Sequence, residues 1–244
     1  MKKINYPVLA LILANIIWGA TSPIIKYSLE NIPPFSLAFI RFLIASLILF
    51  PLVHKKIDYP DLKNKWLWVY ALFGITLNIS FFFAALERTT AINATIIAST
   101  GPVMVLIGSA LFLREKFKLN VSLGVIIALI GAIVIIFQPI LEQGFDGALT
   151  GNLFMILATL GAVIATIAGR KFLTEKNAAG ATFLSCLIGC LTFLPFMLWE
   201  FWQNPGWIAG LDTRGIVGII YGGVFSSTIA YVIYNWALAK LPAF

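Results

Sequence analysis

The stretch FFFAALERTTAINATIIASTGPVMVLIGSALFLREKF, residues 81–117, decides the fold of this chain. It holds two apolar runs separated by the polar corner Glu87–Thr90, and the second run ends in the charged triplet Arg114–Lys116. With its flanking residues, each run has the roughly 20 residues that an α-helix needs to cross a bilayer. Because the corner is only a few residues long, the sequence predicts that the two helices are antiparallel neighbours.

The composition of the whole chain indicates a lipid environment. Of its 244 residues, 60% are hydrophobic and only 11% are charged, and the mean hydropathy is +0.96. A soluble domain is nearer about half apolar and about a quarter charged. Water could not solvate so apolar a surface, so the sequence predicts an all-α, polytopic membrane helix bundle.

Eight stretches are long and apolar enough to be complete spans, and a ninth would begin at Pro242. The predicted spans are Tyr6–Leu29, Phe35–Val53, Trp66–Leu86, Ala91–Leu113, Leu119–Pro139, Leu149–Phe172, Ala178–Phe201 and Gly215–Leu238. Pro23 and Pro102 fall inside the first and fourth spans. Each proline removes one backbone hydrogen bond and is expected to kink its helix.

The charges predict an orientation. The formal net charge is +7, and most of the 17 Lys and Arg residues fall in loops on one side of the predicted spans. The positive-inside rule then places the N-terminus in the cytoplasm. We expect no nucleic-acid partner, because no basic patch with interleaved aromatic residues lies outside the spans. Cys186 and Cys190 have no His or carboxylate beside them, so the sequence predicts neither a metal site nor a cofactor.

Short patterns recur in the same order in the two parts of the chain. The pairs are Trp18-Gly19-Ala20 with Leu160-Gly161-Ala162, Leu49-Phe50-Pro51 with Phe193-Leu194-Pro195, and Ala85-Leu86 with Ala237-Leu238. Five spans per unit is an odd number, so the second unit would enter the membrane from the opposite side. The sequence predicts an inverted repeat of five-helix units, residues 1–140 and 149–244. The second unit is expected to lack its last two helices, roughly 45 to 55 residues at bilayer length.

At these positions the chain resembles the drug/metabolite transporter superfamily, in its EamA-type branch of ten-span carriers. The likeness covers the whole chain. It rests on Trp18-Gly19-Ala20 with Lys26, Pro33 through Arg41-Phe42, Ala84-Ala85-Leu86 followed by Ala91, Pro102, and Leu113-Arg114-Glu115-Lys116. The resemblance implies export or exchange of small metabolites, often amino acids, across the bacterial inner membrane.

Polar, charged and aromatic side chains inside the spans are the candidates for a substrate site. They are Trp18, Lys26, Arg41, Asn78, Thr95, Ser99, Tyr231 and Tyr234. Arg41 lies well inside its span and Lys26 near the outer end of its own, and both could meet as a positive collar for a substrate carboxylate. The alternative is that Lys26 snorkels to the interface while Arg41 pairs with Glu30 or caps carbonyl groups.

The remaining candidates have structural alternatives of their own. The amide of Asn78 needs a hydrogen-bond partner in lipid, which either another helix or the solute could supply. Thr95 and Ser99 share one helix face beside the kink expected at Pro102. The three aromatic candidates could line a pocket or pack against lipid and neighbouring helices.

Glu115 is a candidate gate residue. It lies between two cations at the inner end of the fourth span and could form and break an ion pair during transport. The alternative is an interfacial charge that balances its neighbours. No Asp or Glu lies near the middle of a predicted span, which favours facilitated diffusion or solute exchange over proton coupling.

Taken with this resemblance, the sequence predicts a multi-pass transporter of the bacterial inner membrane. It would move small organic metabolites, amino acids or related solutes, outward by alternating access. Its partners would be the small-molecule substrate and membrane lipids. A carrier of sugar phosphates or nucleotide sugars is one alternative, but it would need more cations deep in the cavity. A membrane-embedded enzyme is another, and the sequence offers no metal spacing or acid pair to serve as catalytic residues.

Overall fold

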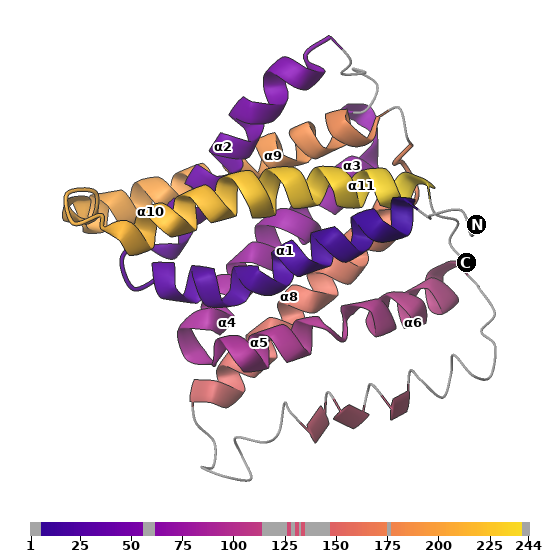
Figure 1. The fold of residues 1–244 in the computed structure, drawn as a ribbon, viewed down its shortest axis with the longest axis horizontal. Coiled ribbons are helices and arrows are strands. Elements are labelled where there is room, and N and C mark those ends of the chain that lie inside the picture. The colour runs from indigo at the N-terminus through magenta and orange to yellow at the C-terminus, as the bar shows by residue number, and fades with distance from the viewer. Residues whose placement is uncertain are drawn as a thin grey trace.

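The computed structural model of this protein describes residues 6–55, 62–113, 126–127, 130–131, 133–134, 147–174 and 177–240. Within these ranges all regular structure is helical, and seven helical segments are long and apolar enough to cross a membrane (Figure 1). Four of the segments are single helices: α1 (Tyr6–Ser28), α2 (Pro34–Val53), α8 (Gly147–Gly169) and α9 (Ala178–Gln203).

The other three segments change their helix type or break along their length. The segment α3–η2–α4 consists of α3 (Lys65–Ala71), the π-helix η2 (Leu72–Leu77) and α4 (Asn78–Arg88). The segment α10–η4–α11 consists of α10 (Thr213–Ile220), the π-helix η4 (Tyr221–Ala230) and α11 (Tyr231–Lys240). In the third segment, Ser99 and Thr100 separate α5 (Ala91–Ala98) from α6 (Gly101–Leu113). Elsewhere in the chain, the connection from α9 to α10 contains a single 3-10 turn, η3 (Pro205–Trp207).

Seven of the eight predicted spans are confirmed, with ends that differ from the prediction by a few residues. The predicted span 119–139, apart from isolated positions, and the ninth start at Pro242 lie outside the described residues. Pro23 lies within α1, which continues as one helix to Ser28. Pro102 follows directly on the break between α5 and α6, as the second residue of α6.

The chain reverses at the corner between α4 and α5. Thr90 starts α5, because its hydroxyl accepts the backbone N–H of Asn93 at 3.1 Å. The two segments run in opposite directions, as predicted. They contact each other only near the corner, however, because α8 packs against both of them (Figure 1). The sequence predicted the direction correctly, but it missed the helix from the other half of the chain that lies between them.

Glycines allow α8 to approach both of these segments closely. A Cβ atom on Gly161 of α8 would lie 2.7 Å from the backbone oxygen of Phe73 in η2. On the other side, a Cβ atom on Gly108 of α6 would lie 2.7 Å from the Cδ1 atom of Ile167 in α8. Neither contact is visible in the hydropathy of a single span, because each depends on which helix faces the glycine.

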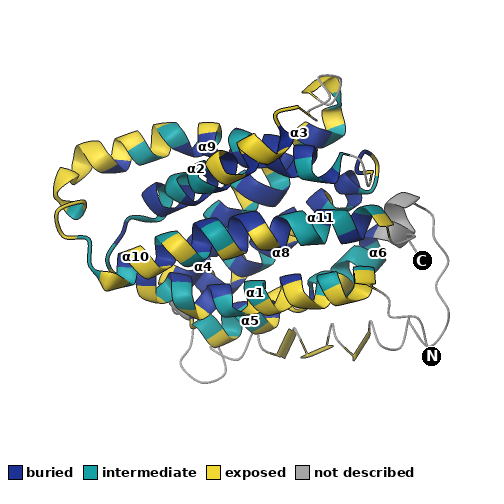
Figure 2. Cartoon of the chain, turned by 45° about the horizontal axis from the view of Figure 1, so that its top comes forward, coloured by how far each residue is buried: buried dark blue, intermediate teal, exposed yellow. Residues whose placement is uncertain are grey.

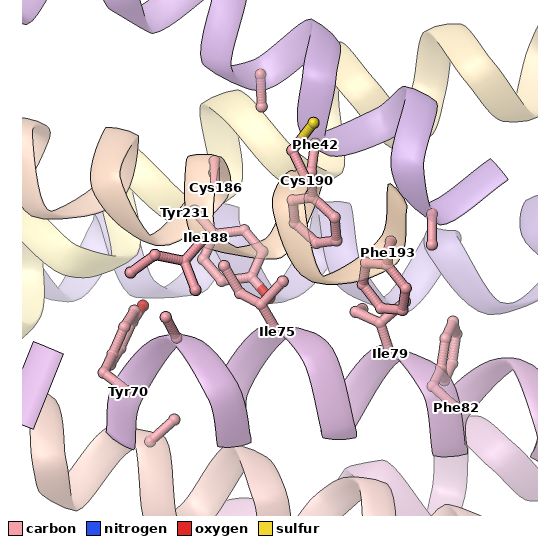
Figure 3. Close-up of a cluster of buried hydrophobic side chains, with 14 of the residues drawn as sticks. Phe42, Tyr70, Ile75, Ile79, Phe82, Cys186, Ile188, Cys190, Phe193 and Tyr231 are labelled. Atoms are coloured by element: carbon pink, nitrogen blue, oxygen red, sulfur yellow. The ribbon is translucent and has the colours of Figure 1, made fainter. Parts of the chain in front are cut away.

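Helices α2 and α9 pack against each other in the core. The rings of Phe42 and Phe193 stack with their centroids 6.0 Å apart. Gly189 of α9 lets η2 approach as well, because a Cβ atom there would lie 2.5 Å from the Cγ2 atom of Ile75. Figure 3 shows these apolar side chains meeting between α2, α9 and the α3–η2–α4 segment.

The start of α2 is capped from α9 rather than by its own residues. The carboxylate of Glu200 accepts the backbone N–H of Phe35 at 3.0 Å, and the backbone N–H and hydroxyl of Ser36 at 2.7 Å each. A negative charge at a helix N-terminus is favourable, since the first N–H groups there have no partner within the helix. Glu200 therefore fixes the position of the first turn of α2 against the end of α9.

Helix α1 packs against α10–η4–α11, and α8 packs against α3–η2–α4. Both pairs are antiparallel. Close neighbours along the first pair are Ser28 with Gly218 and Trp18 with Tyr234, and along the second pair Gly151 with Thr89 and Gly169 with Tyr70. In Figure 1 the yellow α11 lies beside the indigo α1, and α8 lies beside α4.

Large apolar side chains cover the outside of the bundle. Ile16 of α1, Leu47 of α2 and Leu191 of α9 are 64%, 64% and 59% exposed. Figure 2 shows such exposed residues along the outer faces of α1 and α9. Apolar residues gathered on the outer faces of long helices suit contact with lipid tails and not with water. The described part of the chain is a multi-pass helical membrane protein.

Candidate functional site

The two π-helices lie near the middle of their segments and face the centre of the bundle. A π-helical turn shifts the backbone bonding pattern, and such turns occur often at functional sites. Side chains from other helices bond to carbonyl groups at these turns. The hydroxyl of Tyr231 donates to the carbonyl of Gly74 in η2 at 3.2 Å, and Nε1 of Trp18 donates to the carbonyl of Ser226 in η4 at 3.2 Å. These two bonds link the two segments that contain π-helices with each other and with α1, near the middle of the bundle.

Arg41 of α2 is the charged residue at this centre. It is only 1% exposed, and its guanidinium donates from Nε and Nη2 to the hydroxyl of Ser227, and from Nη2 to the hydroxyl of Ser226. The same Ser226 hydroxyl accepts a bond from Thr21 of α1 at 3.3 Å. The serine pair on η4 therefore connects the buried cation with α1.

Three aromatic side chains lie beside the serine pair. Trp18 contacts Tyr231 with the ring centroids 5.3 Å apart and Tyr234 with the centroids 5.0 Å apart. The Tyr234 hydroxyl lies 2.9 Å from the hydroxyl of Thr166 on α8. Trp18, Arg41, Tyr231 and Tyr234, four of the residues predicted for the site, thus lie together around η4.

A second buried polar set extends from this centre. The hydroxyl of Tyr70 donates to the amide oxygen of Asn235 at 2.8 Å, and the amide nitrogen of Asn235 donates to the hydroxyl of Thr182 at 2.8 Å. Each residue comes from a different segment, so the set ties α3, α9 and α11 together. The sequence analysis did not propose these three residues, or Thr21, for the site. The available signal in the sequence was the presence of hydroxyl and amide side chains within apolar runs. There are many such side chains, so the sequence alone could not show which of them contact each other.

The structure does not bring the other candidates to Arg41. Asn78 bonds to the carbonyl of Ala158 on α8 at 2.7 Å, and thus links two helices. The hydroxyls of Thr95 and Ser99 bond back to carbonyls of their own helix, and Ser99 is exposed. Glu115, the predicted gate residue, lies outside the described residues.

Lys26 also lies apart from Arg41, at one end of the bundle. Its ammonium group donates to the carbonyls of Leu86, at the end of α4, and of Thr89, the latter at 2.7 Å. Glu30, the alternative partner for Arg41, instead forms an ion pair with Arg214 at 3.0 Å. The positive collar of Lys26 and Arg41 is therefore not formed in this structure, since each cation bonds to a different segment.

We define the Lys26 end of the bundle as the end where α1 and α4 finish and α10 begins. Several bonds between distant segments close it. The hydroxyl of Thr89 donates to Asn152 of α8 at 2.7 Å, and the amide of Asn31 donates to the carbonyl of Gly210 at 2.9 Å. Hydrogen bonds from Arg214 lower the pKa of Asp212 below its ordinary value of 3.8, so this carboxylate stays ionised at neutral pH.

Replacing Lys26 with methionine is expected to loosen the Lys26 end, because the carbonyls of Leu86 and Thr89 lose their donor while the apolar stem is kept. In a background with Cys186→Ala, Cys190→Ala and Ser22→Cys, a thiol reagent should label position 22 about fivefold faster or more. Ser22 lies on α1 and is 4% exposed, so labelling there reports opening. Lys65→Met, in the exposed first turn of α3, is the matched control. Equal rates in both variants would contradict this role of Lys26.

Comparisons with known proteins agree with this architecture. The model of the EamA-like transporter family matches residues 5–137 and 149–244. An uncharacterized transporter of Archaeoglobus fulgidus is 31% identical over 238 residues, covering 95% of this chain and 80% of the relative. Uncharacterized transporter YetK of Bacillus subtilis is 28% identical over 254 residues, covering 100% of this chain and 74% of the relative.

A solved crystal structure shares the fold, with a TM-score of 0.65 at 17% identity over 96% of this chain and 79% of that one. The family match covers nearly the whole length of the sequence, including the segments that carry Arg41 and the two π-helices. The chain therefore belongs to the EamA-like transporter family, as the residues in its first four spans had suggested.

Proposed function

We propose that this protein carries small organic metabolites, amino acids or related solutes, across the cell membrane by alternating access, most often outward. Two inverted repeats, residues 1–140 and 149–244, move against each other around a site at Arg41 and the two π-helices. The observation that carries this proposal is the exchange of contacts between the two parts of the chain, with a buried charge where they meet.

One contact from each pair of segments supports the proposed repeat. Thr21 of α1 bonds to Ser226 of η4, and Ala165 of α8 lies where a Cβ atom on Gly74 of η2 would be 2.5 Å away. If Gly74 and Ser226 are equivalent, as the pairing of Leu86 with Leu238 implies, then Thr21 is equivalent to Ala165. This pairing differs by two residues from the pairing of Gly19 with Gly161 that the sequence suggested.

The π-helices support the same relation. With Leu86 equivalent to Leu238, the whole of η2 (Leu72–Leu77) corresponds to residues inside η4 (Tyr221–Ala230). A helix interruption at the same depth in both halves is typical of transporters that bind their substrate at the midplane. Such turns also provide two hinge points at which the Lys26 end and the opposite end could open in turn.

The orientation in the proposal has the N-terminus in the cytoplasm of a bacterial cell and the Lys26 end facing outward. Cations gather at the opposite end of the bundle, where Lys171 lies 3.9 Å from the ring centre of Trp66 and Lys65 lies 5.4 Å from it. Positive charge on one side favours that side as cytoplasmic.

Counterflow in liposomes tests the transport function. Vesicles that contain the full chain and are preloaded with an unlabelled amino acid should transiently accumulate the same labelled amino acid from outside. The rate should not depend on a pH gradient, because no carboxylate is expected at mid-membrane to couple protons. A panel of amino acids that exchanges no faster than in protein-free vesicles would contradict the proposed function.

A further inference from the structure

The charge of Arg41 has no counter-charge among the described residues. The ion pairs found there belong to Arg88 and Arg214, both of which are partly exposed. Ser226 and Ser227 offer Arg41 neutral hydroxyls, which orient the guanidinium but do not balance its charge. An unbalanced charge is costly inside a membrane, and such residues usually mark a substrate pathway. The counter-charge is therefore expected to arrive with a ligand.

The guanidinium has one free donor group. Nε and Nη2 donate to Ser227 at 3.3 and 3.2 Å, and Nη2 also donates to Ser226 at 3.3 Å. Nη1 is buried and has no hydrogen-bond partner among the residues that the structure describes. The rings of Phe42 and Phe83 flank the group at 5.6 and 5.7 Å from Cζ. The flanking rings favour an acceptor that approaches in the guanidinium plane, as carboxylates do.

The number of available cations favours a single negative charge. Lys26 is engaged by the carbonyls of Leu86 and Thr89 at one end of the bundle, and so does not add its charge to that of Arg41. A carboxylate carries one negative charge, whereas a phosphate monoester carries about 1.5 to 2 at neutral pH. A single guanidinium with only Nη1 free therefore matches a carboxylate better than it matches a phosphate monoester.

Gly222 of η4 holds the Arg41 side chain in place. A Cβ atom on this glycine would lie 2.5 Å from Cδ and 2.8 Å from Nε of Arg41, so any other residue would push the stem aside. The aromatic cluster of Trp18, Tyr231 and Tyr234 is joined to Ser226, because the Ser226 carbonyl accepts the bond from Trp18 Nε1. Its rings offer surface for an apolar body or an ammonium group.

We propose that Arg41 binds the carboxylate of a small monocarboxylate solute through its free Nη1 edge, next to the Trp18–Tyr231–Tyr234 cluster. This inference rests on the proposed transport function and adds the chemical class of the solute. Gly222 is a positioning residue in this site, because it sets where the guanidinium lies without contacting the solute.

Chemical labelling tests the site without any need for transport. The purified full chain is treated with methylglyoxal, which modifies arginine, and modification of Arg41 is followed by mass spectrometry. A mixture of leucine, phenylalanine and pyruvate should slow this modification about tenfold, and the corresponding amides should not. Protection by the amides as well, protection only by glycerol 3-phosphate, or an Arg41 that is never modified would each overturn the proposal. The last result would mean that no aqueous solute reaches the residue.

Variants test the same assignment in counterflow. Arg41→Gln should weaken the apparent affinity for a transported carboxylate about 30-fold or more while sparing its amide, and Arg41→Lys should retain part of the affinity. Gly222→Ala should act in the same direction as Arg41→Gln but less strongly. Gly19→Ala, at a glycine with no atom within 4 Å of the added Cβ, is the matched control.

The two experiments separate this inference from the proposed function. If carboxylates protect Arg41 but no solute of the panel is exchanged, the transport function fails and the carboxylate site stands. If carboxylates and amides are exchanged equally well by the wild-type protein and by Arg41→Gln, the transport function stands and the carboxylate site is overturned.

Discussion

Gly161→Leu is expected to prevent α8 from seating against η2 and to cost about 3 kcal/mol of stability or more. The reason is steric: even a Cβ atom at this position would lie 2.7 Å from the backbone oxygen of Phe73. Backbone cannot move aside as the tip of a side chain can, so α8 must shift away from η2. The expected result is a loss of monodisperse protein on size-exclusion chromatography in detergent, and a lower thermal midpoint for whatever remains folded.

Gly19→Leu is the matched control for this experiment. Gly19 occupies the corresponding place in the sequence pattern, since Trp18-Gly19-Ala20 and Leu160-Gly161-Ala162 are alike. A Cβ atom on Gly19 meets nothing within 4 Å, so the added side chain would extend into open space. Gly19→Leu should keep the wild-type elution profile and midpoint. Equal behaviour of the two leucine variants would mean that α8 does not lie against η2 as described.

Glu200→Ala should be the most destabilising of the single carboxylate removals among the described residues, at about 2–3 kcal/mol. Two backbone N–H groups and the Ser36 hydroxyl would lose the acceptor that caps α2. Glu200→Gln keeps an acceptor oxygen but loses the charge, so it should recover about half of this loss. The measurement is the thermal midpoint in detergent, followed by a tryptophan fluorescence ratio.

Glu87→Ala is the control for Glu200. Its carboxylate pairs with Arg88 on the surface, where the Glu87 side chain is 41% exposed, and removing such a pair should change stability by about 0.5 kcal/mol or less. A Glu200→Ala midpoint that matches the midpoint of Glu87→Ala would show that the cap between α9 and α2 contributes nothing measurable.

The sequence by itself determined three things about this chain. It showed that the chain belongs in a membrane, it gave the approximate ends of most spans, and it indicated the family. Hydropathy and turn chemistry depend only on residues close in sequence, so the apolar runs and the corner at Glu87–Thr90 can be recognised without knowing which segments pack against them. The sequence also proposed Arg41, Trp18, Tyr231 and Tyr234 for the site, because a charged residue and aromatic residues within apolar spans can be recognised from residue type and position.

Only the tertiary structure decided which of these residues meet. It separated Lys26 from Arg41, brought Arg41 to the serines of η4, and placed α8 between two segments that are adjacent in sequence. An apolar helix is equally well solvated by lipid whichever way it is rotated about its own axis, so hydropathy cannot predict which helix faces contact each other. That choice depends on the steric fit of residues far apart in the chain, as Gly161 against Phe73 shows, and it is made only when the helices pack together.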